Sequence, residues 1–298
     1  MTRVPDRLER AVERAVSRLT HDGCPPRLQA AVRYAVFPAG NRWRPRLCYA
    51  VAQALGDDRP DLTDAAATAL ELLHCASLVQ DDLPAFDDAP ERRGRPALHR
   101  AFGDATAILV ADALIIGAFE TVARETAVDP ERVRDLTLAI TRGVGTPHGA
   151  VAGQAWESEA AIDLEQYHRA KTAALFESAT AAGAIAAGYD PDPWRTVGSW
   201  LGRAYQVADD LADEASIGRG SDAALGRPNA AHHLGVERSA ALLDRCITKA
   251  LEAVPLCPGR AAFQEFVRLI AAKFRRMALP QSAVPEAEER LSAAGGGR

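Results

Sequence analysis

The sequence predicts an all-α protein, built as a single bundle of about ten or more helices. Apolar residues recur at helical spacing along nearly the whole chain, and alternating strand patterns are almost absent. The chain has 298 residues, 48% of them hydrophobic, which is enough to enclose a large core. We find no internal repeat and no long linker, so one domain over 1–298 is expected, with 280–298 as a partly disordered tail.

The helices are expected between loops that proline and glycine mark. "FPAGNRWRP" at 37–45, "GYDPDPW" at 188–194 and "IGRGSDAALGRPN" at 217–229 are three such loops. Taken in order, the periodic segments lie at about 6–20, 25–37, 46–55, 62–81, 105–127, 130–145, 147–160, 164–188, 192–214, 230–253 and 260–277. The most apolar stretch, 107–123, contains Asp112 and Glu120, so it is interpreted as a buried helix that falls short of a membrane span.

Composition excludes several classes of protein. Asp and Glu outnumber Lys and Arg by 40 to 35, which argues against a nucleic-acid partner. The N-terminus is charged throughout and lacks the apolar run of a signal peptide. The cysteines, five in number, form no CxxC pair, which indicates neither a disulfide framework nor a zinc site. A cytoplasmic protein with reduced thiols is expected.

One acidic cluster stands out in "LVQDDLPAFDDAPERRG" at 78–94. Four aspartates fall within eight residues, and two adjacent arginines follow. Grouped carboxylates repel one another unless a cation lies between them. Magnesium is commonly held by one or two carboxylates together with substrate phosphates, and arginine binds phosphate bidentately. Taken alone, the cluster fits a solvated surface loop equally well.

A second acidic cluster changes that balance. "AYQVADDLADE" at 204–214 places Asp209, Asp210 and Asp213 on a predicted helix, where residues four apart share a face. Both clusters fall near the C-terminal ends of helices, where the macrodipole also attracts cations. The surrounding residues are mostly Ala, Leu and Val, as in the wall of a cavity.

Several motifs, in order along the chain, resemble those of the trans-polyprenyl diphosphate synthases. They are "AGNRWRP" at 39–45, "HCASLVQDD" at 74–82, "DDLPAFD" followed by "RRG", "YHRAKTAALF" at 167–176, and "YQVADD" followed by "LAD". The stretches 71–103 and "GQAWESE" at 153–159 are most similar to the short geranylgeranyl diphosphate synthases of bacterial carotenoid pathways. The resemblance implies an isoprenoid synthase bundle around a deep central cavity, a homodimer, and three Mg²⁺ ions per active site.

The implied reaction condenses isopentenyl diphosphate with an allylic diphosphate (dimethylallyl, geranyl or farnesyl). The allylic diphosphate ionises, the resulting carbocation is attacked, and a proton is lost. Carried over by position, the implied metal ligands are Asp81, Asp87 and Asp209, supported by Asp82, Asp210 and Asp213. Arg92 and Lys171 would bind the allylic diphosphate, and Thr172 and Gln206 would line the cation. The implied site for isopentenyl diphosphate is Asn41, Arg42, His74 and Arg93.

The chain departs from the family pattern at a few positions. Asn41 stands where lysine is usual, which removes one cation from the isopentenyl diphosphate site. Tyr205 replaces a phenylalanine and Gln80 a histidine. The loop after Asp213 is shorter than usual in the family, and the lysine usual there is absent unless Arg219 takes its role.

The length of the product is expected to depend on the small residues Ala76 and Ser77, one turn before Asp81. They leave room for a growing chain, with a floor at Leu73 and at Ile115 or Phe119, so geranylgeranyl diphosphate is the expected product. The alternative use of small residues here is close helix packing. Three other functions stay open: a farnesyl diphosphate synthase, a class I terpene cyclase of the same fold, and a non-catalytic subunit that tunes product length.

Overall fold

The computed structural model describes residues 4–278, apart from 128, 162 and 216–233. The first half holds α1 (Val4–Leu19), α2 (Pro26–Val36), α3 (Trp43–Leu55), α4 (Pro60–Asp81), β1 (Glu91–Arg92), β2 (Arg95–Pro96), α5 (Leu98–Phe102) and α6 (Asp104–Ala123). A 3₁₀ turn (Arg124–Ala127) leads to α7 (Pro130–Val144), α8 (Ala150–Trp156), α9 (Leu164–His168), the π-helical turn η2 (Arg169–Ala173), α10 (Ala174–Ala186), α11 (Asp192–Ala215), α13 (Val236–Glu252) and α14 (Arg260–Met277).

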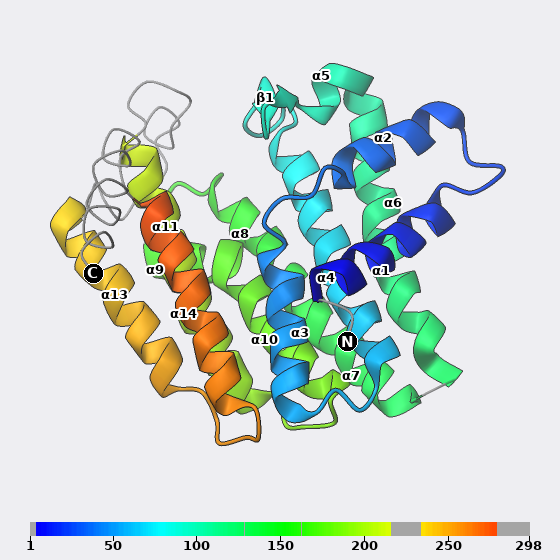
Figure 1. Ribbon diagram of the computed structural model, residues 1–298. Coiled ribbons are helices and arrows are strands. Elements are labelled where there is room, and N and C mark those ends of the chain that lie inside the picture. Colours follow the sequence, from blue (N-terminus) through cyan, green and yellow to red (C-terminus); the bar gives the residue numbers. More distant parts are fainter. Residues whose placement is uncertain (1–3, 128, 162, 216–233, 279–298) are drawn as a thin grey trace, which may run out of the picture.

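The prediction of an all-α bundle is confirmed. In Figure 1 the long helices stand side by side, and the β1–β2 hairpin lies at one end of the bundle. α4 packs against α6, α3, α10 and α1, and α10 packs against α11, α3 and α7. Every residue of α10 except Glu177 is buried, and half of the buried ones are alanine, so neighbouring helices approach it closely.

Local signals account for several helix boundaries. Proline occupies the first turn of α2, α4 and α7, where its missing N–H costs no hydrogen bond. The Asp129 carboxylate caps α7 by accepting a hydrogen bond from the Arg132 backbone N–H at 3.0 Å. Gly56 ends α3 in the left-handed conformation with φ of 111°.

The observed elements differ from the predicted ones at three places. The segment expected as one helix over 164–188 is interrupted by the π turn η2. The helix expected over 147–160 is only α8, because turns follow Trp156. The hairpin and α5 were not predicted, because each of their segments is only two to five residues long. The expectations for Arg219 and for the tail 280–298 lie outside the described residues.

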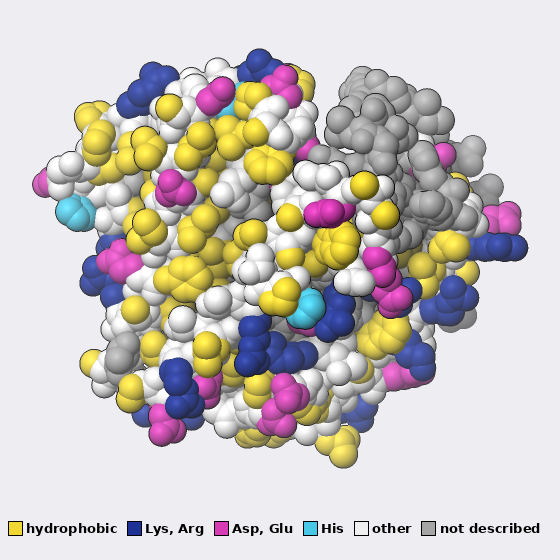
Figure 2. All heavy atoms as spheres, turned by 180° about the vertical axis from the view of Figure 1, so that it is seen from behind, with side chains coloured by type: hydrophobic (Ala, Val, Ile, Leu, Met, Phe, Trp, Pro, Cys, Tyr) yellow, Lys and Arg dark blue, Asp and Glu magenta, His cyan; other side chains and the backbone are white. Residues whose placement is uncertain are grey.

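The apolar helix α6 is less buried than expected. Both α4 and α6 are long and apolar enough to span a membrane, so the prediction that 107–123 falls short is wrong by that measure. The most apolar window of α4 is 78% buried, as in a core helix, whereas that of α6 is only 44% buried. Ile108, Leu109 and Ile116 of α6 are exposed by 50%, 55% and 67%. Figure 2 shows hydrophobic side chains spread over the half of the surface where α6 lies.

Candidate active site

The first aspartate cluster lies where α4 ends. Asp82 is the C-cap of α4, and its carboxylate is almost fully buried against Arg92, whose Nε donates to Oδ1 at 3.0 Å. The following loop folds back, since the Asp87 N–H donates to the Asp81 carbonyl at 3.0 Å. Asp82 is therefore fixed in an ion pair, while Asp81 and Asp87 are half-buried beside it.

The surroundings of Asp81 disfavour its ionised form. Burial raises the pKa of Asp81 to about 6, and the nearby carboxylates of Asp87 and Glu157 add to the increase. Lys171 and Arg92 oppose it. A carboxylate in this position gains stability when a cation binds beside it.

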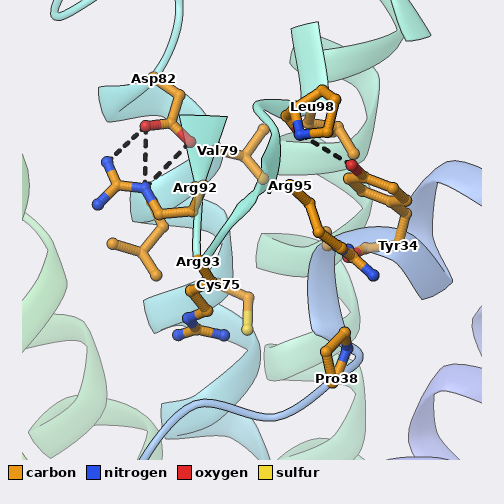
Figure 3. Close-up of a pocket in the computed structure, with 12 residues that line it drawn as sticks. Tyr34, Pro38, Cys75, Val79, Asp82, Arg92, Arg93, Arg95 and Leu98 are labelled. Atoms are coloured by element: carbon orange, nitrogen blue, oxygen red, sulfur yellow. Dashed lines mark hydrogen bonds and ion pairs between the residues drawn. The ribbon is translucent and has the colours of Figure 1, made fainter. Parts of the chain in front are cut away.

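The arginine pair owes its geometry to the β1–β2 hairpin. Residues 92 and 95 face each other across the strands, and the two-residue turn places Arg93 at φ of 55° and Gly94 at φ of 73°. Two successive positive φ values define a type I′ turn, which glycine favours at its second position. Because Arg92 lies in the strand and Arg93 in the turn, their side chains diverge (Figure 3). Arg92 reaches Asp82, and Arg93 points along α4 toward Cys75.

The second aspartate cluster lies on α11. Asp209 and Asp213 are half-buried, whereas Asp210 is only 1% exposed and accepts a hydrogen bond from Gln206 Nε2 at 2.8 Å. Gln206 in turn accepts a hydrogen bond from the Thr172 hydroxyl. The C-terminal ends of α4 and α11 lie at the same, upper end of the bundle in Figure 1.

The π turn η2 carries the predicted lysine and threonine. Thr172 faces α11, while the Lys171 ammonium pairs with Glu157, which follows α8, and acts electrostatically on Asp81. The Tyr167 hydroxyl also donates to Glu157 at 2.7 Å. Gly153 permits this arrangement, because a Cβ there would lie 2.3 Å from the Lys171 backbone. Glu157 was missed by the sequence interpretation, although the quoted motif "GQAWESE" contains it.

A second cationic group surrounds His74 on α4. Arg44 Nη1 lies 3.3 Å from His74 Nε2, and the backbone of Gly40 lies against the Arg93 guanidinium. The pKa of His74 is well below its ordinary value, first because the ring is buried and then because Arg44, Arg93 and other arginines repel its protonated form. A neutral imidazole among arginines is suited to bind an anion.

Arg42 lies elsewhere. Its side chain is 3% exposed, and it pairs with the Glu71 carboxylate at 2.7 Å and the Glu9 carboxylate at 3.1 Å. This placement argues against Arg42 as a diphosphate ligand and indicates that it ties α1 to α4. Arg44, two residues later, occupies the position beside His74 instead. The motif contains both arginines, and sequence reasoning chose the one that pairs internally.

The residues expected to control product length lie on α4 below Asp81. Ala76 is 1% exposed, and the Ser77 hydroxyl donates to the His74 carbonyl at 2.9 Å. Leu73 is 2% exposed, and Ile115 and Phe119 of α6 pack partly buried against the same core.

Comparison with known proteins identifies the family. A sequence model described as polyprenyl synthetase matches residues 25–253. The chain is 50% identical over 273 residues to a geranylgeranyl diphosphate synthase of Cereibacter sphaeroides, covering 90% of this chain and 95% of that one.

The chain belongs to the polyprenyl synthetase family.

Two further proteins are similar to this polyprenyl synthetase. A geranylgeranyl diphosphate synthase of Rhodobacter capsulatus is 47% identical over 283 residues, with 93% of this chain and 97% of that one covered. The crystal structure of an FPP/GFPP synthase from Zymomonas mobilis superposes with a TM-score of 0.77 at 29% identity, covering 90% of this chain and 98% of that one. The protein is a prenyltransferase enzyme, as the sequence predicted.

The predicted metal ligands of this polyprenyl synthetase are divided between two clusters, at the end of α4 and on α11. Within the described residues, no group of three or more His, Cys, Asp or Glu side chains could hold a metal ion by itself. Carboxylates that need phosphate oxygens to complete a coordination shell fit magnesium, which keeps few protein ligands. The half-buried oxygen donors Asp81, Asp87 and Asp209 suit that requirement.

Proposed function

We propose that the protein is a geranylgeranyl diphosphate synthase that condenses isopentenyl diphosphate with a shorter allylic diphosphate. The observation that carries the proposal is the pair of acidic helix ends, on α4 and α11, with an arginine hairpin and a lysine beside the first. The names of the two relatives that are 50% and 47% identical support the product assignment.

Magnesium, bound through Asp81, Asp87 and Asp209, would neutralise the diphosphate leaving group. Arg92 and Lys171 add fixed positive charge next to the same carboxylates. Asp82 holds Arg92 in place, and Asp210 holds Gln206. Three ions per site, the expected number, would be counted by titrating bound Mn²⁺ in the presence of inorganic diphosphate.

The residues around the allylic carbocation must stabilise it without reacting with it. Thr172 and Gln206 are buried and hydrogen-bonded to each other, and Gln206 is also bonded to Asp210. Their oxygens contribute dipoles that stabilise positive charge. Because their hydrogen bonds hold them in place, neither group acts as a mobile nucleophile.

We propose Arg44, His74 and Arg93 as the site for the diphosphate of the second substrate, isopentenyl diphosphate. All of them converge where α3 begins and α4 approaches its end. Arg44 also lies over the Phe176 ring, with its guanidinium carbon 4.9 Å from the ring centroid, which fixes its direction. Asn41 is exposed beside Gly40, so it adds a polar group without charge.

The test is incubation of the purified protein with Mg²⁺, isopentenyl diphosphate and each allylic diphosphate in turn, followed by product analysis. The proposal expects a twenty-carbon diphosphate as the main product. A fifteen-carbon product would indicate a farnesyl diphosphate synthase, and a cyclic hydrocarbon made without isopentenyl diphosphate would indicate a terpene cyclase. A protein that shows no turnover by itself, but changes the products of another synthase when the two are mixed, would be a length-tuning subunit.

We propose that a second copy of the chain covers the apolar side of α6. Ile108, Leu109 and Ile116 are large apolar side chains exposed on one helix, and the family resemblance implies a homodimer. Light scattering during size-exclusion chromatography should give a dimer for the wild type and a monomer for Ile116→Lys. The control is Leu256→Lys, because Leu256 is 88% exposed and far along the chain.

We also propose a single domain and a cytoplasmic location. One buried apolar cluster includes residues from α1 through α14, which supports the single domain. Limited proteolysis should therefore leave one resistant fragment, and fractionation of cells should recover the protein from the cytoplasm.

A further inference from the structure

We propose that Tyr34 and Arg95 position the arginine pair for diphosphate binding by anchoring the β1–β2 hairpin to α2. This proposal rests on the proposed function for its kinetic consequences. Neither residue belongs to the candidate active site. We call their contacts, together with the one to Pro96, the Tyr34 anchor.

The hairpin has little intrinsic stability. Each strand is two residues long, and such an isolated two-stranded ribbon is marginal in water. Beside the hairpin, a pocket of about 40 Å³ remains between it, α2 and α4. External contacts must therefore hold Arg92 and Arg93 in place.

The Tyr34 anchor supplies three such contacts on the side facing α2. The Arg95 guanidinium carbon lies 3.8 Å from the centroid of the Tyr34 ring, and its Nη2 donates to the Tyr34 carbonyl at 2.8 Å. The Tyr34 hydroxyl donates to the Pro96 carbonyl at 2.8 Å. Figure 3 shows Arg95 turned toward Tyr34 while Arg92 extends the other way to Asp82.

The strand register connects the anchor to the arginine pair. Arg95 is the cross-strand partner of Arg92, and Arg93 occupies the turn between them. Fixing Arg95 therefore fixes the strand position of Arg92 and the direction of the turn. Because the Arg95 guanidinium is stacked and hydrogen-bonded on α2, Arg95 is a positioning residue, and substrate phosphate is left to Arg92 and Arg93.

The test compares Tyr34→Leu and Arg95→Gln with Arg27→Gln. Arg27 makes the same kinds of contact, a stack on the Phe102 ring at 5.8 Å and a hydrogen bond to the Phe102 carbonyl at 2.7 Å, but it joins α2 to α5 and not to the hairpin. Tyr34→Phe is the conservative variant, since it keeps the stack and loses one hydrogen bond.

The expected kinetic result is a rise of about tenfold in KM for isopentenyl diphosphate in Tyr34→Leu and in Arg95→Gln. Tyr34→Phe should change it by about threefold, and Arg27→Gln should not change it. At saturating substrates kcat should stay within about twofold of the wild type, because the metal-binding carboxylates are untouched. The double variant should be worse than either single one but by less than the product of the two effects, because the two substitutions share only the loss of the stack.

A second readout does not depend on catalysis. Trypsin cleaves after arginine, so a loosened hairpin should be cut after Arg92 or Arg93 about tenfold faster in Tyr34→Leu and Arg95→Gln than in Arg27→Gln. Equal KM values and equal cleavage rates in all variants would overturn the anchor. Faster cleavage with unchanged KM would overturn its role in substrate binding. A wild type that elongates no allylic diphosphate would instead refute the proposed function, and the cleavage experiment would still test the anchor.

Discussion

Replacing Asp81 with asparagine is expected to stabilise the metal-free protein at alkaline pH while nearly abolishing prenyl transfer. Burial raises the pKa of Asp81 from its ordinary 3.8 to about 6. At about 1.4 kcal/mol for each pKa unit, ionising this carboxyl in the folded protein costs about 3 kcal/mol. Asparagine has a similar shape and no charge, so the variant avoids that cost.

The direction of the effect sets the pH range of the assay. Because folding raises the pKa of Asp81, the cost is absent below about pH 4, grows as pH rises, and is complete above about pH 6. With EDTA present, the midpoint of thermal unfolding of Asp81→Asn should exceed that of the wild type by about 6 °C at about pH 8, at about 2 °C per kcal/mol. At about pH 4 the two midpoints should coincide.

Mg²⁺ with inorganic diphosphate should largely cancel the difference between the two thermal midpoints at alkaline pH. At a ligand concentration about 100-fold above Kd, binding stabilises the wild type by about 2.7 kcal/mol. The variant should gain less, and its kcat should fall by about 10³-fold. Asp88→Asn is the control, because Asp88 is 53% exposed and paired at the surface with Arg100, so its stability should change by about 0.5 kcal/mol or less. Equal midpoints for wild type and Asp81→Asn at pH 8 in EDTA would refute the reasoning, as would near-normal turnover.

Five other substitutions test the remaining assignments. Arg44→Met should raise KM for isopentenyl diphosphate by about 30-fold in steady-state kinetics, with little change in the thermal midpoint. Arg42→Met should instead lower the free energy of unfolding, measured by urea titration, by about 3–5 kcal/mol, because it leaves Glu71 buried without its cation. Asn41→Lys should lower KM for isopentenyl diphosphate more than KM for the allylic substrate, and an unchanged constant would mean that the site does not need a cation there. Ala76→Phe or Ser77→Phe should shift the product from twenty to fifteen carbons by chromatography, and a product still of twenty carbons in both would place the channel elsewhere.

The helices were largely predictable because their signals are local. Prolines at the starts of α2, α4 and α7 and continuous 3.6-residue periodicity identify long helices from neighbouring residues alone. The hairpin was not predictable in this way. Its two-residue strands are too short to show periodicity. The sequence "RRG" fits a charged loop as well as a hairpin turn until the turn conformation of Arg93 is known.

The partners of the charged side chains could be identified only from the structure. Sequence identified Asp82 and Asp210 as supporting residues, but only the structure shows that both are buried beside their partners, Arg92 and Gln206. The same reasoning could not separate Arg42 from Arg44, because which arginine faces Glu71 depends on the left-handed backbone at residue 42, where φ is 52°. Such a long-range pairing, 29 residues apart, leaves no local pattern.

The π turn η2 makes the spacing within "RAKTA" as important as its composition. A π turn accommodates one residue more than an α-helical turn, and such turns occur often at functional sites. Removing Ala170 would let the segment relax to a regular α-helix and rotate everything before it by about 100° relative to α10. Lys171 and Thr172 would stay adjacent in the sequence, yet Glu157 and Tyr167 would face a different direction. A gap of one residue here in a related sequence would therefore signal a changed active site even where lysine and threonine are both retained.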